Sequence, residues 1–221
     1  MFDTILFDFD GTLVDTNELI ITTFLHVLEG KTATPLTRET IIPRMGLPLR
    51  EQLHLFSGQE EVDELILAYR AYNLQVHDEL IRKYPYVDEV LRELHENGIR
   101  MGLVTNKVRI TTEKGLKLMG YDAYITEAVT ADDVQVGKPD PEGVLQGVSL
   151  FQSDPEKTLM VGDSHFDILA GQRAGVRTAG VAWSLKGEEY LAEYNPDYML
   201  KDMRDLLAIT GIKRDVPCRE K

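Results

Sequence analysis

The sequence lacks the features of an exported or membrane-bound chain. Its single cysteine, Cys218, excludes an intramolecular disulfide and suits a reducing compartment. No apolar run approaches the about 20 residues that a membrane-spanning helix requires. The opening residues 1–4 carry neither the basic nor the apolar segment of a signal peptide. We therefore expect a cytoplasmic protein, long enough to bury a substantial core.

Basic residues are also scarce. The chain has 24 lysines and arginines against 37 aspartates and glutamates, a formal net charge of −13. This balance argues against nucleic acid and anionic membranes as partners, because both require a basic surface. An anionic substrate would need a bound cation and nearby lysines or arginines in order to approach. The sequence contains no internal repeat and indicates no particular oligomeric state.

Short apolar runs alternate with helical patterns along most of the chain. The expected strands are 4–9, 101–105, 123–129, 158–161 and 178–183, and the expected later helices are 87–97, 109–119, 141–150 and 166–174. Gly98, Gly120 and Gly175 follow three of these helices, as is typical of helix ends. This alternation predicts an α/β fold, a Rossmann-like parallel sheet with helices on both faces.

The segment from about residue 17 to 84 breaks this alternation. It contains helical patterns at 18–28, 49–56 and 62–81 but no convincing strand. We interpret it as a helical lid over the end of the first strand, with hinges at 14–16 and 83–85. The expected domains are a core of residues 1–15 and 85–213, a helical cap of residues 16–84, and a flexible polar tail of residues 214–221.

The segment Asp8-Phe9-Asp10-Gly11-Thr12 follows the apolar run Ile5-Leu6-Phe7. In an extended chain Asp8 and Asp10 would fall on the same side. Two neighbouring carboxylates repel each other, so a divalent cation, a shared proton or solvent must relieve the repulsion. Open α/β sheets bind ligands at the carboxyl ends of their strands, which favours a metal-dependent reaction centre here. A solvated turn is the alternative.

Three further polar segments follow expected strands or precede expected helices. Thr105 and Asn106 could donate hydrogen bonds to an oxyanion, or could cap the next helix. Lys138, between Gly137 and Pro139, could neutralise a carboxylate and a phosphate together, or could be a solvated loop lysine. The third segment contains Asp163 and Asp167, which are four residues apart and would share one face of a starting helix; helix capping is the alternative there.

The order of these motifs resembles the haloacid dehalogenase-like (HAD) superfamily over nearly the whole chain: Asp-x-Asp-Gly-Thr, then Thr, then Lys-Pro, then Gly-Asp-x-x-x-Asp. The helical insertion is similar to the C1-type cap of that superfamily. The resemblance implies that Asp8 is a nucleophile that forms an aspartyl-phosphate and that Asp10 is the general acid and base. It also implies that Thr105 and Lys138 bind the transferred phosphoryl group.

The resemblance further implies a Mg²⁺ ion held by Asp8, the carbonyl of Asp10 and Asp163, with Asp167 as a ligand or a supporting residue. Mg²⁺ prefers such oxygen ligands, and phosphoryl transfer depends mainly on positioning and charge stabilisation. The haloalkanoate dehalogenases of the superfamily lack an acid at the position of Asp10. A carboxyl group there suits phosphate hydrolysis, so a hydrolase acting on a small phosphorylated substrate is expected.

Within the superfamily the chain resembles the bacillar inorganic pyrophosphatases. The segments that carry this resemblance are 16–21, 69–73, 77–80 and 180–183, together with His26 and Lys186-Gly187. It implies hydrolysis of pyrophosphate, including pyrophosphate released when the sugar-transport carrier HPr is dephosphorylated by phosphorolysis. Pyrophosphate is small and highly charged, so a closed lid should leave little room for an organic leaving group.

Substrate binding is predicted for Thr12, Asn106, Glu18 and Arg44. Arg44 begins a segment that resembles the cap loop of phosphoglycolate phosphatases and could pair with a second anionic group, or could be a surface arginine. Glu18 could hold a second Mg²⁺, an outer-shell water or the cap hinge. His26 is expected to be a core histidine. Weaker candidates are Arg70, His77, Lys107 and Arg109.

Other functions are compatible with parts of the sequence. The same machinery could act on phosphoglycolate or another small phosphomonoester, which the segment at Arg44 permits. A phosphomutase would need cap residues that hold a bisphosphate, and none can be assigned. A catalytically silent binding protein is disfavoured, because Asp8, Asp10, Thr105, Lys138 and Asp163 are all present.

Overall fold

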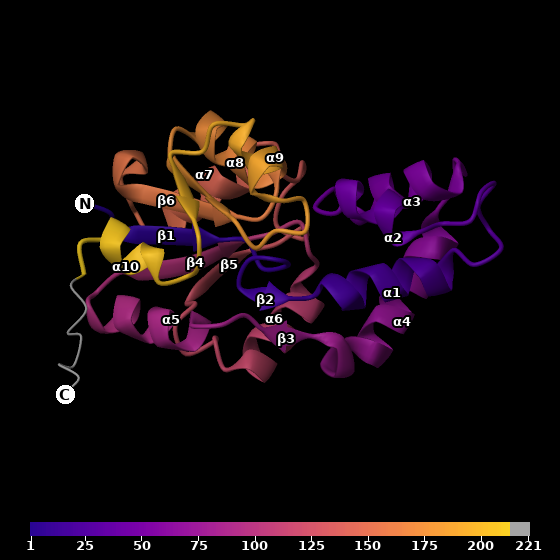
Figure 1. Cartoon of the computed structure of the whole chain (residues 1–221), viewed down its shortest axis with the longest axis horizontal. Helices are drawn as coiled ribbons and strands as arrows, with labels where there is room; N and C mark the ends of the chain where they lie inside the picture. Colours follow the sequence, from indigo (N-terminus) through magenta and orange to yellow (C-terminus); the bar gives the residue numbers. More distant parts are fainter. Residues whose placement is uncertain (213–221) are drawn as a thin grey trace.

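The computed structural model describes residues 1–212, so the predicted tail and Cys218 lie outside the described residues. Its main sheet has six strands in the order β5-β4-β1-β6-β7-β8, and all paired neighbours are parallel (Figure 1). Their bounds are β1 Thr4–Phe7, β4 Arg100–Val104, β5 Glu127–Val129, β6 Thr158–Gly162, β7 Arg177–Val181 and β8 Tyr198–Leu200. The predicted α/β fold is confirmed.

Helices cover both faces of this sheet. They are α5 Val87–Glu96, α6 Arg109–Met119, α7 Glu142–Leu150, α8 His165–Ala174, α9 Glu188–Ala192 and α10 Asp205–Ile209, with a short 3-10 helix η2 at Pro155–Lys157. Ile5 and Phe7 of β1 pack into one apolar cluster, whereas Leu6 packs into a second. Because successive side chains of a strand point to opposite faces, the two clusters lie on opposite sides of the sheet.

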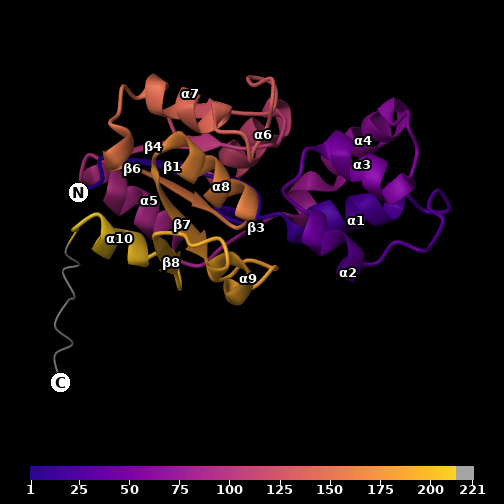
Figure 2. The same cartoon turned by 90° about the horizontal axis from the view of Figure 1, so that it is seen from above.

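The remaining helices form a separate lobe at one end of the sheet in both views (Figures 1 and 2). They are α1 Asn17–Val27, α2 Arg38–Ile41, the 3-10 helix η1 Ile42–Arg44, α3 Leu49–Ser57 and α4 Asp63–Leu80. Phe24, Leu53 and Leu65 belong to an apolar cluster confined to this lobe. We refer to it as the cap. No helix in residues 1–212 combines the length and apolar character needed to cross a membrane.

The cap is joined to the core by a small antiparallel pair of strands, β2 Val14–Asp15 and β3 Arg82–Lys83. Val14 pairs with Lys83 and Asp15 pairs with Arg82. β2 lies within the first predicted hinge, 14–16, whereas β3 begins one residue before the second, 83–85, and overlaps it only at Lys83. The pair brings the entry and exit of the cap together, and the domain boundaries at 16 and 84 stay a prediction.

The structure differs from the sequence expectations at several strand ends. β1 ends at Phe7 instead of residue 9, so Asp8 and Asp10 lie in the loop that follows. The two carboxylates still lie on one side, as expected, because both line the pocket described below, whereas Phe7 and Phe9 share one apolar cluster. That loop is closed by hydrogen bonds from the Leu13 and Val14 amides to the Phe9 carbonyl. The strand expected from residue 123 begins at Glu127, because Tyr124 and Ile125 lie in a turn.

The cap also contacts the core through α4 and α6. His77 of α4 is fully buried, and its Nδ1 lies 2.7 Å from Asp78, which pairs with Lys114 of α6. Its Nε2 has no hydrogen-bond partner within residues 1–212. Burial lowers the pKa of His77 and outweighs the opposing carboxylate of Asp78. His77 is therefore part of the contact between cap and core and does not line the pocket described below.

Acidification should weaken the fold through His77. Because its pKa is lowered in the folded protein, the unfolded chain binds the proton more tightly, and stability falls as the pH drops below about 6.5. Between pH 7.5 and 5.5 the free energy of urea unfolding should fall less for His77→Gln than for the wild type. His95→Gln, at an exposed position of α5, is the control, and its free energy of unfolding should fall as much as that of the wild type. Equal losses in all three proteins would contradict this prediction.

Candidate active site

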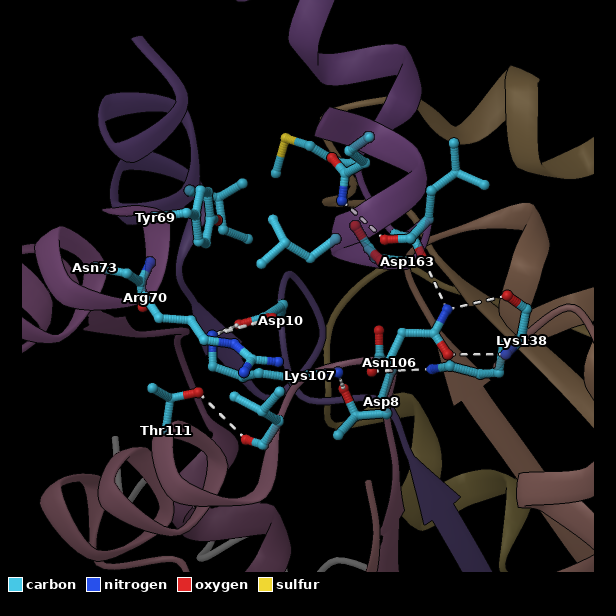
Figure 3. A pocket seen from close by; sticks show the side chains of 18 residues that line it. Asp8, Asp10, Tyr69, Arg70, Asn73, Asn106, Lys107, Thr111, Lys138 and Asp163 are labelled. Carbon is cyan, nitrogen blue, oxygen red and sulfur yellow. Dashed lines mark hydrogen bonds and ion pairs between the residues drawn. The ribbon is translucent and has the colours of Figure 1, made fainter. Parts of the chain in front are cut away.

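The carboxyl ends of three neighbouring strands bring the predicted residues together. Asp8 follows β1, Thr105 follows β4 and Asp163 follows β6, while Lys138 lies in the loop before α7. All four line one pocket between the sheet and the cap, and Asp10 lines it as well (Figure 3). The strand order places β4 and β6 on either side of β1, which is where the chain reverses direction across the sheet.

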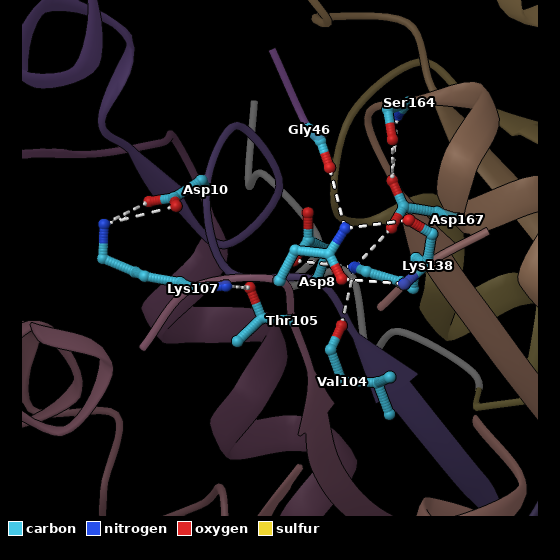
Figure 4. A network of polar contacts seen from close by, with 10 residues as sticks. Asp8, Asp10, Gly46, Val104, Thr105, Lys107, Lys138, Ser164 and Asp167 are labelled. Carbon is cyan, nitrogen blue, oxygen red and sulfur yellow. Dashed lines mark hydrogen bonds and ion pairs between the residues drawn. The ribbon is translucent and has the colours of Figure 1, made fainter. Parts of the chain in front are cut away.

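Lys138 lies buried between two carboxylates (Figure 4). Its Nζ is 3.0 Å from Asp8 Oδ1 and 2.5 Å from Asp167 Oδ1, and it donates to the Val104 carbonyl at 2.7 Å. Burial alone would lower the pKa of Lys138, but the two carboxylates outweigh burial and raise it, so the ammonium stays charged. Burial raises the pKa of Asp8 to about 6, although Lys138 opposes this shift.

Asp167 supports Lys138 from the start of α8. It is fully buried, and its Oδ2 accepts hydrogen bonds from the Ser164 amide at 3.0 Å and the Ser164 hydroxyl at 2.6 Å. Its Oδ1 accepts from Lys138, so both oxygens already have donors. Of the two roles open from the sequence, ligand or support, these contacts favour support.

The acidic residues fit a divalent cation. Asp8, Asp163 and Asp167 offer oxygen atoms within 4.8 Å of one another, the ligand type that Mg²⁺ and Ca²⁺ prefer. Burial raises the pKa of Asp163 to about 8, against the opposing ammonium of Lys186. Gly11 has a φ of +75° and a Cβ there would overlap Asp163 Oδ2, so only glycine lets the loop approach this carboxylate. A cation would relieve the repulsion between these acids.

Asp10 and Lys107 form a second ion pair on the pocket wall. Lys107 Nζ lies 3.0 and 3.2 Å from the two oxygens of Asp10. The Lys107 side chain is only 8% exposed, and its backbone amide donates to Thr105 Oγ1 at 3.3 Å. From the sequence Lys107 is only a weaker candidate. Its partner Asp10 lies 97 residues away along the chain, so the residues around Lys107 do not indicate this ion pair. The pair fixes Asp10 on the side of the pocket away from Lys138 (Figure 4).

Two side chains of the core form hydrogen bonds to the cap loop that contains Met45 and Gly46. Asn106 Nδ2 donates to the Gly46 carbonyl at 2.8 Å and to the Lys138 carbonyl at 3.0 Å, and its Oδ1 accepts from the Lys138 amide at 2.8 Å. Lys186 Nζ donates to the Met45 carbonyl at 2.6 Å. Gly46 has a φ of +97°. The amide of Asn106 is thus engaged by backbone groups, and its predicted role in substrate binding stays a prediction.

Other predicted substrate residues lie outside the pocket lining. Thr12 is fully buried, and its hydroxyl has no hydrogen-bond partner among the described residues. Glu18 is exposed and holds Arg38 with two hydrogen bonds of 2.6 and 2.8 Å. Arg44 is exposed at the end of η1. Their roles in substrate binding stay predictions.

Two more residues singled out from the sequence, one histidine and one arginine, also lie outside the pocket lining. The expectation that His26 is a core residue is wrong, because its ring is exposed and stacks on Tyr72 at 3.8 Å between centroids. The buried face of α1 contains Phe24 and Val27, and His26 lies at the exposed edge of the contact with α4, beside Tyr72. Arg109 pairs with Asp133 and does not line the pocket.

The cap residues that do line the pocket include some that sequence reasoning missed. Tyr69 and Asn73 lie on α4 and Gln52 on α3, and Arg70, a weak candidate, lines the pocket with them. Within segment 69–73 the sequence indicates only Arg70 as a candidate, and Tyr69 and Asn73 carry no signal beyond the family resemblance. Which face of α4 meets the core could not be read from the helical pattern alone.

Residues 5–181 match the family model of the haloacid dehalogenase-like hydrolases, and the chain belongs to that family. The pyrophosphatase PpaX of Anoxybacillus flavithermus is 48% identical over 210 residues, 95% of this chain and 97% of the relative. The pyrophosphatase PpaX of Bacillus velezensis is 50% identical over 211 residues, 95% and 96% of the two chains. A Bacteroides fragilis structure described as a haloacid dehalogenase-like hydrolase superposes with a TM-score of 0.85 at 28% identity, covering 93% of this chain and 100% of its own.

Removing the ammonium of Lys138 should destabilise the protein strongly. Lys138→Met leaves two buried carboxylates without their counter-ion, which is expected to lower the free energy of unfolding by about 3–5 kcal/mol. Lys201→Met is the matched control, because Lys201 pairs with Glu188 at the surface, and should cost less than about 1 kcal/mol. Urea unfolding measures both values. A similar cost for the two variants would contradict the central role of Lys138.

Loss of the Asn106 contacts should loosen the cap loop. Asn106→Ala and Lys186→Ala should each raise amide hydrogen exchange at residues 45–47, because each removes a hydrogen bond to this loop, worth about 1 kcal/mol. The double variant should exchange faster than either single variant. Gln172→Ala, which removes side-chain bonds to backbone far from the cap, should leave these amides unchanged. Unchanged exchange in the double variant would show that other contacts hold the loop.

Proposed function

We propose that this chain hydrolyses inorganic pyrophosphate to phosphate through a phosphorylated Asp8. The observation that carries this proposal is the position of Asp8. It lies next to the Lys138 ammonium, belongs to the acidic cluster with Asp163 and Asp167, and lines the same pocket as the carboxyl group of Asp10. The choice of pyrophosphate is supported by the relatives named above.

Asp8 would attack the phosphorus atom, and the bond to the leaving oxygen would break as the Asp8–phosphorus bond forms. Lys138 holds the Asp8 carboxylate in place and supplies positive charge close to the phosphoryl oxygens. Thr105 lines the same pocket and can donate its hydroxyl hydrogen to one of them. Asp10 would give a proton to the leaving oxygen and later take one from the water that hydrolyses the intermediate.

Mg²⁺ is the proposed cofactor, held by Asp8, the Asp10 carbonyl and Asp163, where it would offset the charge of the phosphoryl group. Asp167 would support this site through Lys138 and the start of α8. Without a bound cation, burial raises the pKa values of Asp8 and Asp163, so nearby lysines do not fully offset the cost of burying their negative charges. This requirement is consistent with a chain whose net charge is −13.

The size of the pocket favours a small substrate. Its volume is about 110 Å³, whereas pockets for drug-sized ligands usually span about 300–1,000 Å³. Ile20, Leu47 and Leu49 of the cap are among the residues that line it. Such a pocket suits pyrophosphate better than a sugar phosphate.

Phosphate release should require both the cation and Asp8. With Mg²⁺ the wild type should hydrolyse pyrophosphate faster than phosphoglycolate or sugar phosphates at equal concentration, and EDTA should abolish release. Asp8→Asn should lower release by at least about 1,000-fold, because the amide is a poor nucleophile. Asp88→Asn, at the surface of α5, should retain full activity. Preference for an organic ester would refute the substrate, and release by Asp8→Asn would refute the intermediate.

A further inference from the structure

The pocket contains one cation that the chemistry described above does not use. Arg70, Lys107 and Lys138 all line it. Lys138 pairs with Asp8 and Asp167, and Lys107 pairs with Asp10. Arg70 forms no ion pair or hydrogen bond with any residue in the described part of the chain, although its side chain extends from α4 into the pocket towards Lys107 and Asp10 (Figure 3).

Arg70 is exposed and, like Arg44, has no ion pair or hydrogen bond within residues 1–212, but of these two arginines only Arg70 lines the pocket. Acids outnumber basic residues by 37 to 24, and several other arginines, such as Arg38, Arg50 and Arg109, pair with carboxylates. The carboxylates that line the pocket are Asp8, Asp10 and Asp163. Two of these have lysine partners, and the third belongs to the proposed cation site. The charge of Arg70 is therefore available for an anion that enters the pocket.

The position of Arg70 indicates which part of the substrate it would meet. Asp10 would serve the leaving oxygen, and Lys107 holds Asp10 on the side of the pocket away from Lys138. A group that lies beside Lys107 therefore faces the leaving half of the substrate, whereas Lys138 faces the transferred half. Arginine binds phosphate with two parallel hydrogen bonds, which a neutral alcohol cannot accept in the same way.

We propose that Arg70 and Lys107 form a subsite for an anionic leaving group, namely the leaving phosphate of the pyrophosphate. The inference rests on the proposed function and adds a cause for its selectivity. Cap helix α4 supplies Arg70, whereas the loop after β4 supplies Lys107. The subsite is complete only when cap and core lie together, so an anionic leaving group would itself favour closure of the cap.

The test compares two small substrates that differ in their leaving group, pyrophosphate and methyl phosphate. Arg70→Met keeps much of the apolar stem and removes the charge, and should lower kcat/KM for pyrophosphate about 10- to 100-fold, the range for a lost hydrogen bond to a charged group. The value for methyl phosphate should change less than about 3-fold. Arg70→Lys should recover part of the loss. Arg50→Met is the control, since Arg50 pairs with Asp63 outside the pocket lining.

A binding measurement keeps the inference separate from the proposed function. Calorimetry on the Asp8→Asn protein with Mg²⁺ should show weaker binding of methylenediphosphonate, but not of methylphosphonate, once Arg70→Met is added. Equal losses for both ligands, or no loss for either, would overturn the subsite. A wild type that releases no phosphate from pyrophosphate would overturn the proposed function instead, and the binding comparison would still decide the role of Arg70.

Discussion

The buried ammonium of Lys138 is the interaction on which the site depends. It contacts the carboxylate after β1, the carbonyl at the end of β4 and the carboxylate at the start of α8. Each partner comes from a different part of the chain, and each would be costly to bury without this cation. The same contact therefore orients Asp8, the proposed nucleophile, joins neighbouring strand ends and offsets part of the repulsion between acids.

The effect of Lys138 extends to the cap through its backbone. The carboxamide of Asn106 binds both the amide and the carbonyl of Lys138 and then the carbonyl of Gly46 in the cap loop. Lys186, which lies near the acidic cluster, holds the adjacent Met45 carbonyl. The position of the cap loop is thus coupled to the arrangement of the charged residues by direct contacts, with no need for a long pathway.

The periodic elements and the strand-end acids could be predicted from the sequence, because both depend on local patterns. Helix α6 is observed with the predicted bounds, and Asp8 and Asp163 follow neighbouring strands as parallel sheets require. The partners of Lys107, Asn106 and Lys186 could not be predicted, since each lies at least 32 residues away along the chain. The exposed position of His26 depended on which face of α1 packs against α4, which spacing alone does not determine.

The two lobes carry different parts of the proposed reaction. Asp8, Thr105 and Asp163 project from strand ends whose backbone is fixed by pairing on both sides, which suits groups that must keep one geometry. Arg70 projects from α4, a helix of the cap that contacts the core at α6. A substitution on α4 can therefore change which leaving group is accepted while the nucleophile and its lysine stay in place. In the proposed reaction the residue that selects the leaving group is therefore not one of those that hold the nucleophile, so the two could vary independently on one fold.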